Sequence, residues 1–175
     1  MIWLFAAAVI AVLFMLVRIT KGHGNVPDTA PKPVPSGNAS VFMDKKGNLH
    51  IIPFSVDKLK RGRASEIPVT LDAPYTPEEA GDIVRKCLGL SGSGKSLSSE
   101  ELMKSLGYHD WKGYSKEKKS VSVMCMNGEV ILNSTIRRPD GSFIFRTNGY
   151  ERVLPGNISD SDLGGAVLEL MKLSR

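Results

Sequence analysis

The chain has 175 residues, of which 42% are hydrophobic and 23% are charged; this balance is typical of a globular protein and excludes a disordered one. The formal net charge of +5 comes from short basic patches and is too small to favour a nucleic-acid-binding protein. The spacing of the two cysteines, Cys87 and Cys125, matches no zinc motif or disulfide framework, so we expect both to be reduced core residues.

An apolar segment opens the chain. Met1 to Val17 contains no charge, glycine or proline, and as a helix it spans about 25 Å, against roughly 30 Å for the hydrocarbon core of a bilayer. Because Arg18 and Lys21 follow this run and no small-residue cleavage site ends it, the sequence predicts a permanent single-pass anchor and not a signal peptide. The positive-inside rule then places the N-terminus outside the inner membrane and the rest of the chain in the cytoplasm, with the lipid bilayer as one partner.

Residues 18–40 are rich in proline and glycine and contain almost no apolar side chain. Such a composition favours an extended, semi-rigid tether. The residues that remain are numerous enough for one soluble domain with a buried core. We therefore expect three parts, which are a transmembrane helix at 1–17, a tether at 18–40 and a soluble domain at 41–175.

The soluble domain begins with strand signals. Val41–Met43 and Leu49–Phe54 are apolar runs separated by a loop that contains Gly47, which predicts a hairpin. Pro53 indicates that the second strand ends there or lies at an edge of the sheet. A further strand is expected within Glu66–Leu71.

Two helices follow in the sequence. A capping box at Thr76–Glu79, with Pro77 at the first helical position, starts a helix that runs to about Leu88. A second helix is expected within 98–107, where serines can cap its start and a glycine stops it.

From Ser120 onward apolar residues alternate with polar ones, which predicts strands. The tight turn Asn127-Gly128 and the turn at 139–141 divide this region into a three-stranded meander. A short fourth strand and a capped helix complete the domain. The expected elements are strands at 120–125, 129–136, 142–146 and 150–154 and a helix at 159–173.

The two longer predicted helices resemble each other. The segment from Thr76 aligns without gaps with the segment from Ser159, so that Gly81 matches Gly164. A glycine inside a helix costs about 1 kcal/mol relative to alanine, so each is expected where another backbone packs close. Two pseudo-repeated strand-helix units would explain the similarity, and chance similarity of amphipathic helices is the alternative. The predicted fold class is α+β, with an antiparallel sheet packed with about three helices.

The sharpest motif is a phosphate-loop pattern, G-x-x-x-x-G-K-S, carried by Gly89, Gly94, Lys95 and Ser96. A functional loop of this kind joins a strand directly to a helix. Here a helix is expected before the motif, and no apolar strand ending in Asp follows it to hold Mg²⁺. We therefore interpret residues 89–96 as a Ser/Gly-rich linker and expect no bound cofactor.

Metal and nucleophile chemistry find little support in the sequence. The histidines His23, His50 and His109 are far apart, so we expect no metal site. A Cys125 nucleophile paired with His50 or His109 stays open, because such partners meet in space and not along the chain. A cysteine in an apolar strand is nevertheless more often an inert core residue, so we predict no catalytic residues.

A different signal follows the second helix, where three large aromatic residues stand among charges in a predicted loop. Tyrosine and tryptophan dominate binding interfaces because they bury a large area with few rotatable bonds. A core position is the alternative, and it is favoured for the tryptophan. The predicted partner-binding residues are Tyr108, His109, Asp110, Trp111, Tyr114 and Lys116.

The strand at Ile67–Leu71, the helix start at Thr76–Val84 and the repeated helix at Gly164–Val167 together resemble the immunity proteins of bacterial contact-dependent growth inhibition systems. The resemblance covers about Val41 to Ser174 and rests on the pattern of helices and strands, not on a catalytic signature. It implies a non-enzymatic protein that binds one cognate protein toxin and blocks it, usually by occluding the active site. The anchor and the tether depart from the commonly soluble members of that family.

The leading hypothesis is therefore a membrane-tethered cytoplasmic immunity protein that has no chemistry of its own. Two alternatives remain, and the first of them is of another class. One is a small membrane-anchored ATP- or GTP-binding enzyme that uses residues 89–96. The other is a structural accessory of an envelope complex, which differs from the first hypothesis only in its partner.

Overall fold

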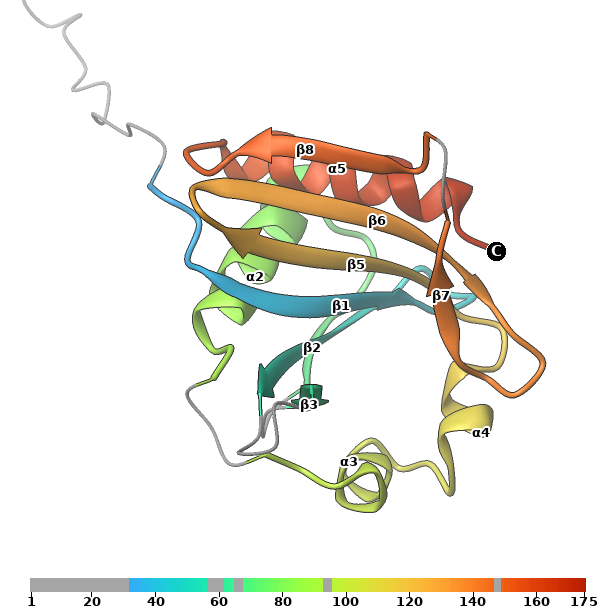
Figure 1. Cartoon of the computed structure of the whole chain (residues 1–175). Helices are drawn as coiled ribbons and strands as arrows, with labels where there is room; N and C mark the ends of the chain where they lie inside the picture. Colours follow the sequence, from blue (N-terminus) through green and yellow to red (C-terminus); the bar gives the residue numbers. More distant parts are fainter. Residues whose placement is uncertain (1–31, 57–61, 65–67, 93–95, 147–148) are drawn as a thin grey trace, which may run out of the picture. The chain divides into compact units, whose positions relative to one another are not determined.

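The computed structural model describes residues 32–56, 62–64, 68–92, 96–146 and 149–175. These residues belong to one compact unit, an antiparallel sheet with four helices in the described part of the chain (Figure 1), which confirms the predicted α+β class. The predicted anchor, residues 1–17, and most of the predicted tether lie outside the described residues. Within the described ranges, none of the helices has both the length and the hydropathy to cross a membrane.

The sheet is antiparallel at every described pairing and follows the order β3-β2-β1-β5-β6-β7, while β4 also pairs with β2 and β8 also pairs with β6. Successive side chains of a strand point to opposite faces, so the alternating residues of the long strands supply two different surfaces. The strands are β1 Gly37–Met43, β2 Leu49–Val56, β3 Gly62–Ala64, β4 Val69–Leu71, β5 Lys119–Met126, β6 Glu129–Arg137, β7 Phe143–Phe145 and β8 Glu151–Pro155.

The described strands form two halves with the same plan. In the first half, β1 and β2 form a hairpin, β3 and β4 both pair with β2, and α2 (Pro77–Gly89) follows. In the second half, β5 and β6 form a hairpin, β7 and β8 both pair with β6, and α5 (Asp160–Leu173) ends the fold. The central strands β1 and β5 lie side by side, with Ser40 opposite Ser122 (Figure 1). A pseudo-twofold axis between β1 and β5 therefore relates the halves, as the helix similarity predicted.

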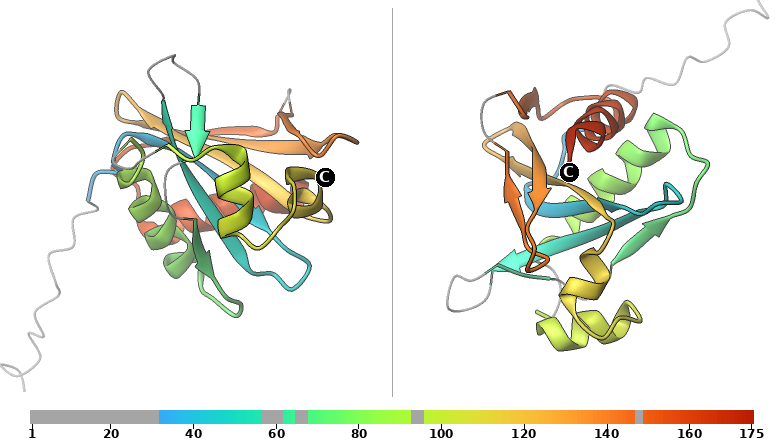
Figure 2. Two further views of the ribbon diagram at one scale, coloured as in Figure 1. Left: turned by 90° about the horizontal axis from the view of Figure 1, so that it is seen from below. Right: turned by 90° about the vertical axis from the view of Figure 1, so that its right-hand side faces the viewer.

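Helices α2 and α5 cover one face of the sheet (Figure 2) and contact each other closely. A Cβ atom on Gly81 would lie 1.8 Å from the carbonyl oxygen of Asp160, and one on Gly164 would lie 1.8 Å from the carbonyl oxygen of Pro77. Each glycine thus meets the first residue of the other helix, and the two contacts obey the pseudo-twofold relation. The predicted close approach of a second backbone at both glycines is confirmed.

The predicted helix starts are also confirmed. Thr76 and Glu79 form the capping box of α2, and Ser159 caps α5 by accepting a hydrogen bond from the amide of Asp162. Between these helices and the sheet lies the main core, in which both cysteines are buried and free, as expected. Its fully buried members include Val41, Leu49, Ile51, Val84, Leu88, Val121, Val123, Val130, Leu132, Leu163 and Val167.

On the opposite face, α3 (Ser99–Ser105) and α4 (Trp111–Ser115) cover the first half of the sheet (Figure 2). Helix α3 starts with the capping box of Ser98 and Glu101, and its C-cap Leu106 is followed by Gly107, whose φ of +75° suits glycine. A second core fills the space between these helices and the sheet. It consists of Phe42, Ile52, Ala64, Leu102, Met103 and Tyr114, with Phe54, Leu97, Leu106, Trp111 and Phe143 packed against them.

Four details differ from the sequence prediction. Strand β1 begins at Gly37, inside the predicted tether, because Asn38 and Ala39 already pair with β2. Strand β2 continues past Pro53 to Val56; β4 pairs with residues 49–51 and β3 with residues 54–56, so the proline lies between the two outer strands. Strand β4 occupies the end of the range predicted for it, and residues 65–67 lie outside the description. Strand β8 is the predicted fourth strand displaced by one residue, and it pairs with β6, a partner that the sequence did not predict.

Candidate partner-binding surface

The segment predicted to bind a partner contains a short helix, α4, where the sequence predicted a loop. Asp110 is its N-cap, because its Oδ1 atom accepts a hydrogen bond of 2.6 Å from the amide of Gly113. The nearby His109 imidazole and the Gly113 amide hold the pKa of the Asp110 carboxyl below its usual value, with the amide as the larger cause. The cap fixes the start of the helix and with it the direction in which the aromatic residues point.

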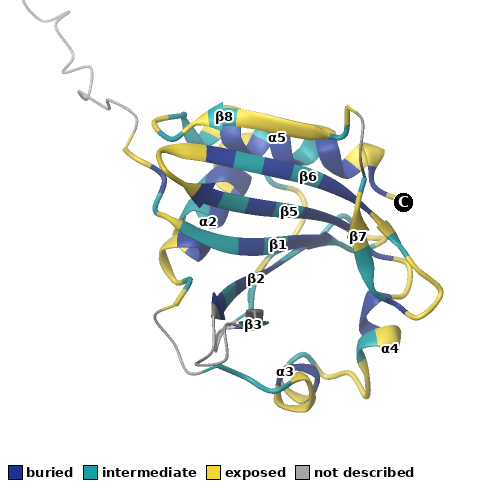
Figure 3. Ribbon diagram, viewed as in Figure 1, coloured by how far each residue is buried: buried dark blue, intermediate teal, exposed yellow. Residues whose placement is uncertain are grey.

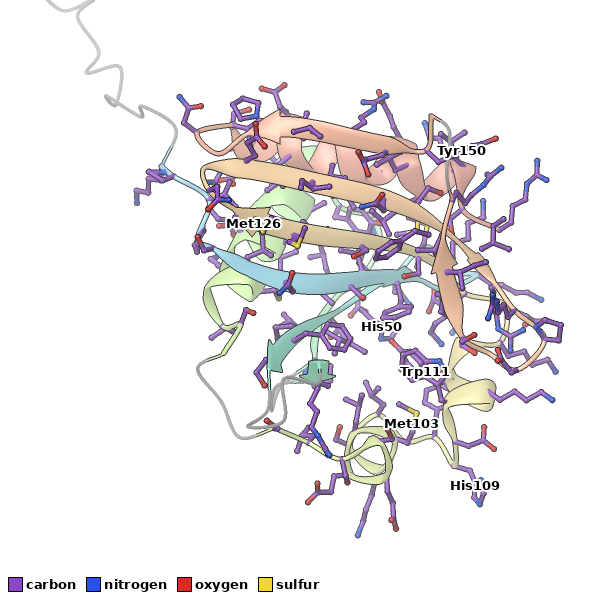
Figure 4. The ribbon with its side chains drawn as sticks, in the orientation of Figure 1. His50, Met103, His109, Trp111, Met126 and Tyr150 are labelled. Carbon is purple, nitrogen blue, oxygen red and sulfur yellow. The ribbon has the colours of Figure 1, made fainter. Side chains whose placement is uncertain are left out.

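Trp111 is fixed by a hydrogen bond from its indole nitrogen and by packing of its ring. Its indole Nε1 donates a hydrogen bond of 2.9 Å to the carbonyl oxygen of Gly141, in the turn before β7. Its ring centroid lies 5.7 Å from that of Phe42 on β1, in an edge-to-face arrangement. Figure 4 shows Trp111 on the same side of the sheet as His50, toward α4. The tryptophan therefore packs against the second core, as the alternative core position predicted, and part of its side chain stays exposed.

Tyr114 corrects the prediction for its own position, because its side chain has no exposed area and belongs to the second core. Its ring contacts Phe42, Tyr108 and Trp111 at centroid distances of 5.5, 5.2 and 5.3 Å. Burial raises its pKa, and its hydroxyl has no hydrogen-bond partner in the described part of the chain. Tyr114 supports the surrounding surface and cannot itself contact a partner while the second core stays closed.

A buried lysine from the basic stretch at residues 112–119 completes this cluster. Lys118 is only 7% exposed, and its Nζ donates a hydrogen bond of 2.7 Å to the carbonyl oxygen of Tyr114. The same ammonium lies 4.3 Å from the ring centroid of Tyr114 and 4.8 Å from that of Tyr108. The cation therefore joins the two tyrosines. Because the exposed Lys116 and Lys119 lie close to it in the sequence, only the fold distinguishes it from a surface lysine.

The remaining predicted residues are exposed. Tyr108 keeps 38% of its surface exposed while its hydroxyl accepts from Lys118, and His109, Asp110 and Lys116 lie at the surface. His109 contacts Asp110 at 3.4 Å and projects away from the domain (Figure 4). Partner binding by these residues stays a prediction, and Tyr108 and Trp111 are the two whose rings are both anchored and accessible.

A hollow of about 410 Å³ adjoins Trp111 on the same side of the sheet. Its wall is mostly apolar, and it is large enough for one or two side chains of a partner. The lining residues are Phe54, Arg63, Ala64, Leu97, Ser99, Leu102 and Trp111.

The second half of this sheet face has no covering element in the described part of the chain (Figures 1 and 3). Met124, Ile131 and Val153 are direct cross-strand neighbours on β5, β6 and β8, and they form an apolar row. Met126 lies at the turn end of this surface (Figure 4) and is 48% exposed. We call this surface the open face and define it by Ser122, Met124, Glu129, Ile131, Asn133, Phe145, Glu151 and Val153.

The phosphate-loop pattern lies in the wrong structural context for its chemistry. Gly89 is the last residue of α2, so a helix and not a strand enters the motif. Ser96 bonds the hydroxyl of Ser55 at 3.3 Å, and a further capped helix, α3, begins only at Ser99. Gly94 and Lys95 lie outside the described residues. The linker interpretation fits the elements on both sides of the motif.

The geometry also disfavours a catalytic pair of a Cys125 nucleophile with a histidine. Cys125 faces α2 in the main core, where its thiol donates to the carbonyl oxygen of Val34, whereas His50 lies on the opposite face of the sheet beside Tyr114. Burial raises the pKa of both thiols, and for Cys87 to about 12, so both are held as neutral thiols at pH 7. Within the described ranges no three His, Cys, Asp or Glu side chains come together as a metal site would require.

Comparisons with known proteins agree with this architecture. The family described as CDI immunity protein matches residues 35–174 of the chain. A solved structure of a protein of unknown function from Neisseria meningitidis is similar in fold, with a TM-score of 0.63 and 16% identity over 82% of this chain and 98% of that one. The CdiA-CT/CdiI toxin and immunity complex from Yersinia pseudotuberculosis gives a TM-score of 0.60 and 14% identity over 81% of this chain and 98% of that one. No curated protein sequence matches the chain significantly.

Proposed function

This chain belongs to the CDI immunity protein family, and we propose that it binds and neutralises one cognate toxin without catalysing a reaction. The match to the family over residues 35–174 is the observation that carries the proposal, and it confirms the resemblance noted in the sequence. The related fold from Yersinia pseudotuberculosis comes from a complex of a toxin with its immunity protein, which supports the same role here.

The surface chemistry supports binding in preference to catalysis. Trp111 is fixed by Gly141 and Phe42, and Tyr108 is fixed by Lys118, so both rings are ordered before a partner arrives. Ordered aromatic side chains lower the entropy cost of association and are typical anchors of tight interfaces. A protein that acts by occlusion needs this kind of rigid surface and no activated nucleophile.

Protection from a candidate toxin, taken from the neighbouring gene where that gene encodes a toxin domain, tests the proposal. We expect cells that express this toxin domain to grow only when the chain is present, and the two purified proteins to form a stable complex. A catalytically inactive toxin variant should bind equally well, because neutralisation by binding does not need toxin activity. Growth arrest in the presence of the chain, together with no complex, would contradict the proposed function.

We further propose that residues 1–17 anchor the protein in the inner membrane and that the domain lies in the cytoplasm. The uncharged run and the basic residues Arg18 and Lys21 directly after it support this arrangement. An extended tether rises about 3.1 Å per residue, so residues 18–31 would give the domain a reach of about 40 Å. A toxin could then be bound close to its site of entry.

Membrane fractionation tests the anchor separately from toxin binding. We expect the full chain to stay with the membrane after carbonate or high-salt washing, which removes peripheral proteins. A Val9→Lys/Val12→Lys variant should move to the soluble fraction and still bind toxin. Release of the wild-type chain by the wash would contradict the anchor and leave the immunity role intact.

A further inference from the structure

The pseudo-twofold relation gives each position on the outer sheet face a counterpart in the other half. Met43 pairs with Leu49 after the first turn, as Cys125 pairs with Val130 after the second. With the two hairpins aligned on these pairs, each outer-face residue of the first half has an equivalent residue in the second half. Phe42 corresponds to Met124, His50 to Ile131, Thr70 to Val153 and Ala64 to Phe145.

Two of the four equivalent pairs differ in exposure. In the first half, Phe42 and Ala64 are 2% and 5% exposed, because α3 and α4 lie over them. Their counterparts Met124 and Phe145 are partly buried and 60% exposed, and the described chain supplies no element to cover them. The other two pairs are alike, since Thr70 and Val153 are both exposed and His50 and Ile131 are both partly buried. The fold thus has two related sites on this face and covers only the first from its own described sequence.

We propose that the toxin fills the second site, and that it does so with an apolar or aromatic anchor flanked on both sides by basic side chains. This inference rests on the proposed function and adds to it the surface and the chemistry of the partner. The first half shows what suits such a site, since the residues that cover it are aromatic and aliphatic side chains on short helices: Leu102, Met103, Trp111 and Tyr114.

The apolar part of the site is the row Met124, Ile131 and Val153. Adjacent strands lie about 4.8 Å apart, so the row extends about 10 Å across three strands. Phe145 on β7 lies at the border with the second core. Phe143, two residues earlier on the same face of β7, packs edge-to-face on Phe42 with 5.5 Å between the ring centroids.

The charges around the row select the partner. Glu129 and Glu151 each precede a residue of the row by two positions, on β6 and β8, and both side chains are exposed. Because β6 and β8 are antiparallel, the two carboxylates lie on opposite sides of the row, about 7 Å away along the strands. Within the described part of the chain neither carboxylate makes an ion pair.

The nearby arginines leave this negative charge uncompensated. Arg146 donates to the carbonyl oxygen of Leu173 and stacks on Tyr150, with 3.3 Å between its guanidinium carbon and the ring centroid. Arg152 forms an ion pair of 2.6 Å with Glu169 on α5, on the other side of the sheet. The open face is therefore acidic although the chain as a whole is basic, and it complements a partner with lysine or arginine on both sides of its anchor.

Two adjacent residues of β7 provide the matched test. Phe145 points to the open face, whereas Ile144 points to the opposite side, and both are exposed. With the purified candidate toxin domain, we expect Phe145→Ala to weaken binding at least 10-fold and Phe145→Ala/Val153→Ala at least 100-fold. Ile144→Ala should change the affinity less than 2-fold. All three variants should keep the melting temperature, because the replaced side chains are exposed.

The charge requirement is tested in parallel. Glu129→Lys/Glu151→Lys should weaken toxin binding at least 10-fold, mainly through slower association at low salt, while Glu78→Lys on α2 should not. If the wild type binds toxin and the open-face variants bind as tightly, the surface is wrong and the immunity role stands. If Phe145→Ala instead converts a dimer to a monomer with unchanged toxin affinity, a second copy is the occupant and the inference fails. If the wild type neither binds nor protects, the proposed function fails, and the inference falls with it.

Discussion

The two faces of the sheet are built by different means. On one face, α2 and α5 meet through backbone atoms, with Gly81 and Gly164 pressed against the first residue of the opposite helix. On the other face, α3 and α4 meet the sheet through rings, a buried cation and a tryptophan hydrogen bond. Backbone contacts tolerate no added atom, whereas side-chain contacts can be exchanged. The helix pair therefore defines the fold, and the outer face can carry specificity at a smaller cost in stability.

Gly164→Ala should break the helix-pair face most severely. The added Cβ would meet the Pro77 carbonyl oxygen at 1.8 Å, and a backbone oxygen cannot rotate away. We therefore expect the free energy of unfolding to fall by about 4 kcal/mol, which is above the usual cost of overpacking. Chemical denaturation measures this free energy. Gly165→Ala is the matched control, because no atom lies within 4 Å of its Cβ position; it should be neutral or add up to about 1 kcal/mol. If both substitutions changed the free energy of unfolding equally, the close backbone contact at Gly164 would not be what holds the two helices together.

The equivalent positions Phe42 and Met124 compare the covered and open halves of the outer face. Phe42 contacts the rings of Trp111, Tyr114 and Phe143, so Phe42→Ala should cost about 3 kcal/mol in unfolding free energy. Met124 is only partly buried, and Met124→Ala should cost under about 1 kcal/mol. A large loss at Met124 would mean that the open face is part of the core and not a surface.

The local structure of the helices could be predicted from the sequence because its causes are local. The capping boxes at Thr76 and Ser98, and the glycines that meet a second backbone, each depend on a few neighbouring residues or on one repeated pattern. Helix α4 was missed because it has only five residues and little apolar periodicity, although Asp110 followed three residues later by Gly113 fits an N-cap.

The outer face could be predicted only in part, because its contacts join residues distant in the sequence. Tyr114 stands in the same aromatic and charged segment as Tyr108, yet only the path of α4 across β1 buries one and exposes the other. Lys118 stands in a charged stretch, next to Glu117 and the exposed Lys119, and its ammonium is buried against two rings. The open face carries no motif, since its residues come from four strands that meet through long-range pairing.

Lys118→Met should separate the role of charge from that of volume on the outer face. Methionine keeps most of the length of the buried side chain but loses the hydrogen bond to the Tyr114 carbonyl and the two cation–π contacts. We therefore expect the free energy of unfolding to fall by about 1 to 2 kcal/mol. Lys118→Ala should cost more, because it also leaves a cavity. If methionine stabilised the protein, the buried cation would serve a purpose other than holding the tyrosines, and toxin binding by this variant would show whether that purpose is recognition.

The smallest effect is expected from pH, and it again concerns the outer face. Burial and the nearby Lys118 lower the pKa of His50, outweighing the opposing pull of Asp44 at 3.8 Å. A histidine with a depressed pKa in the folded state stabilises the fold fully above its unfolded value of about 6.5, and this contribution declines as pH falls below that value. Between pH 7.5 and 5.5 the melting temperature should therefore fall because of this group. His50→Leu should remove that slope, and His109→Gln, on the exposed tip, should not. A slope unchanged in His50→Leu would show that other groups on the chain set the pH response and that the second core is insensitive to the partly buried imidazole of His50 beside it.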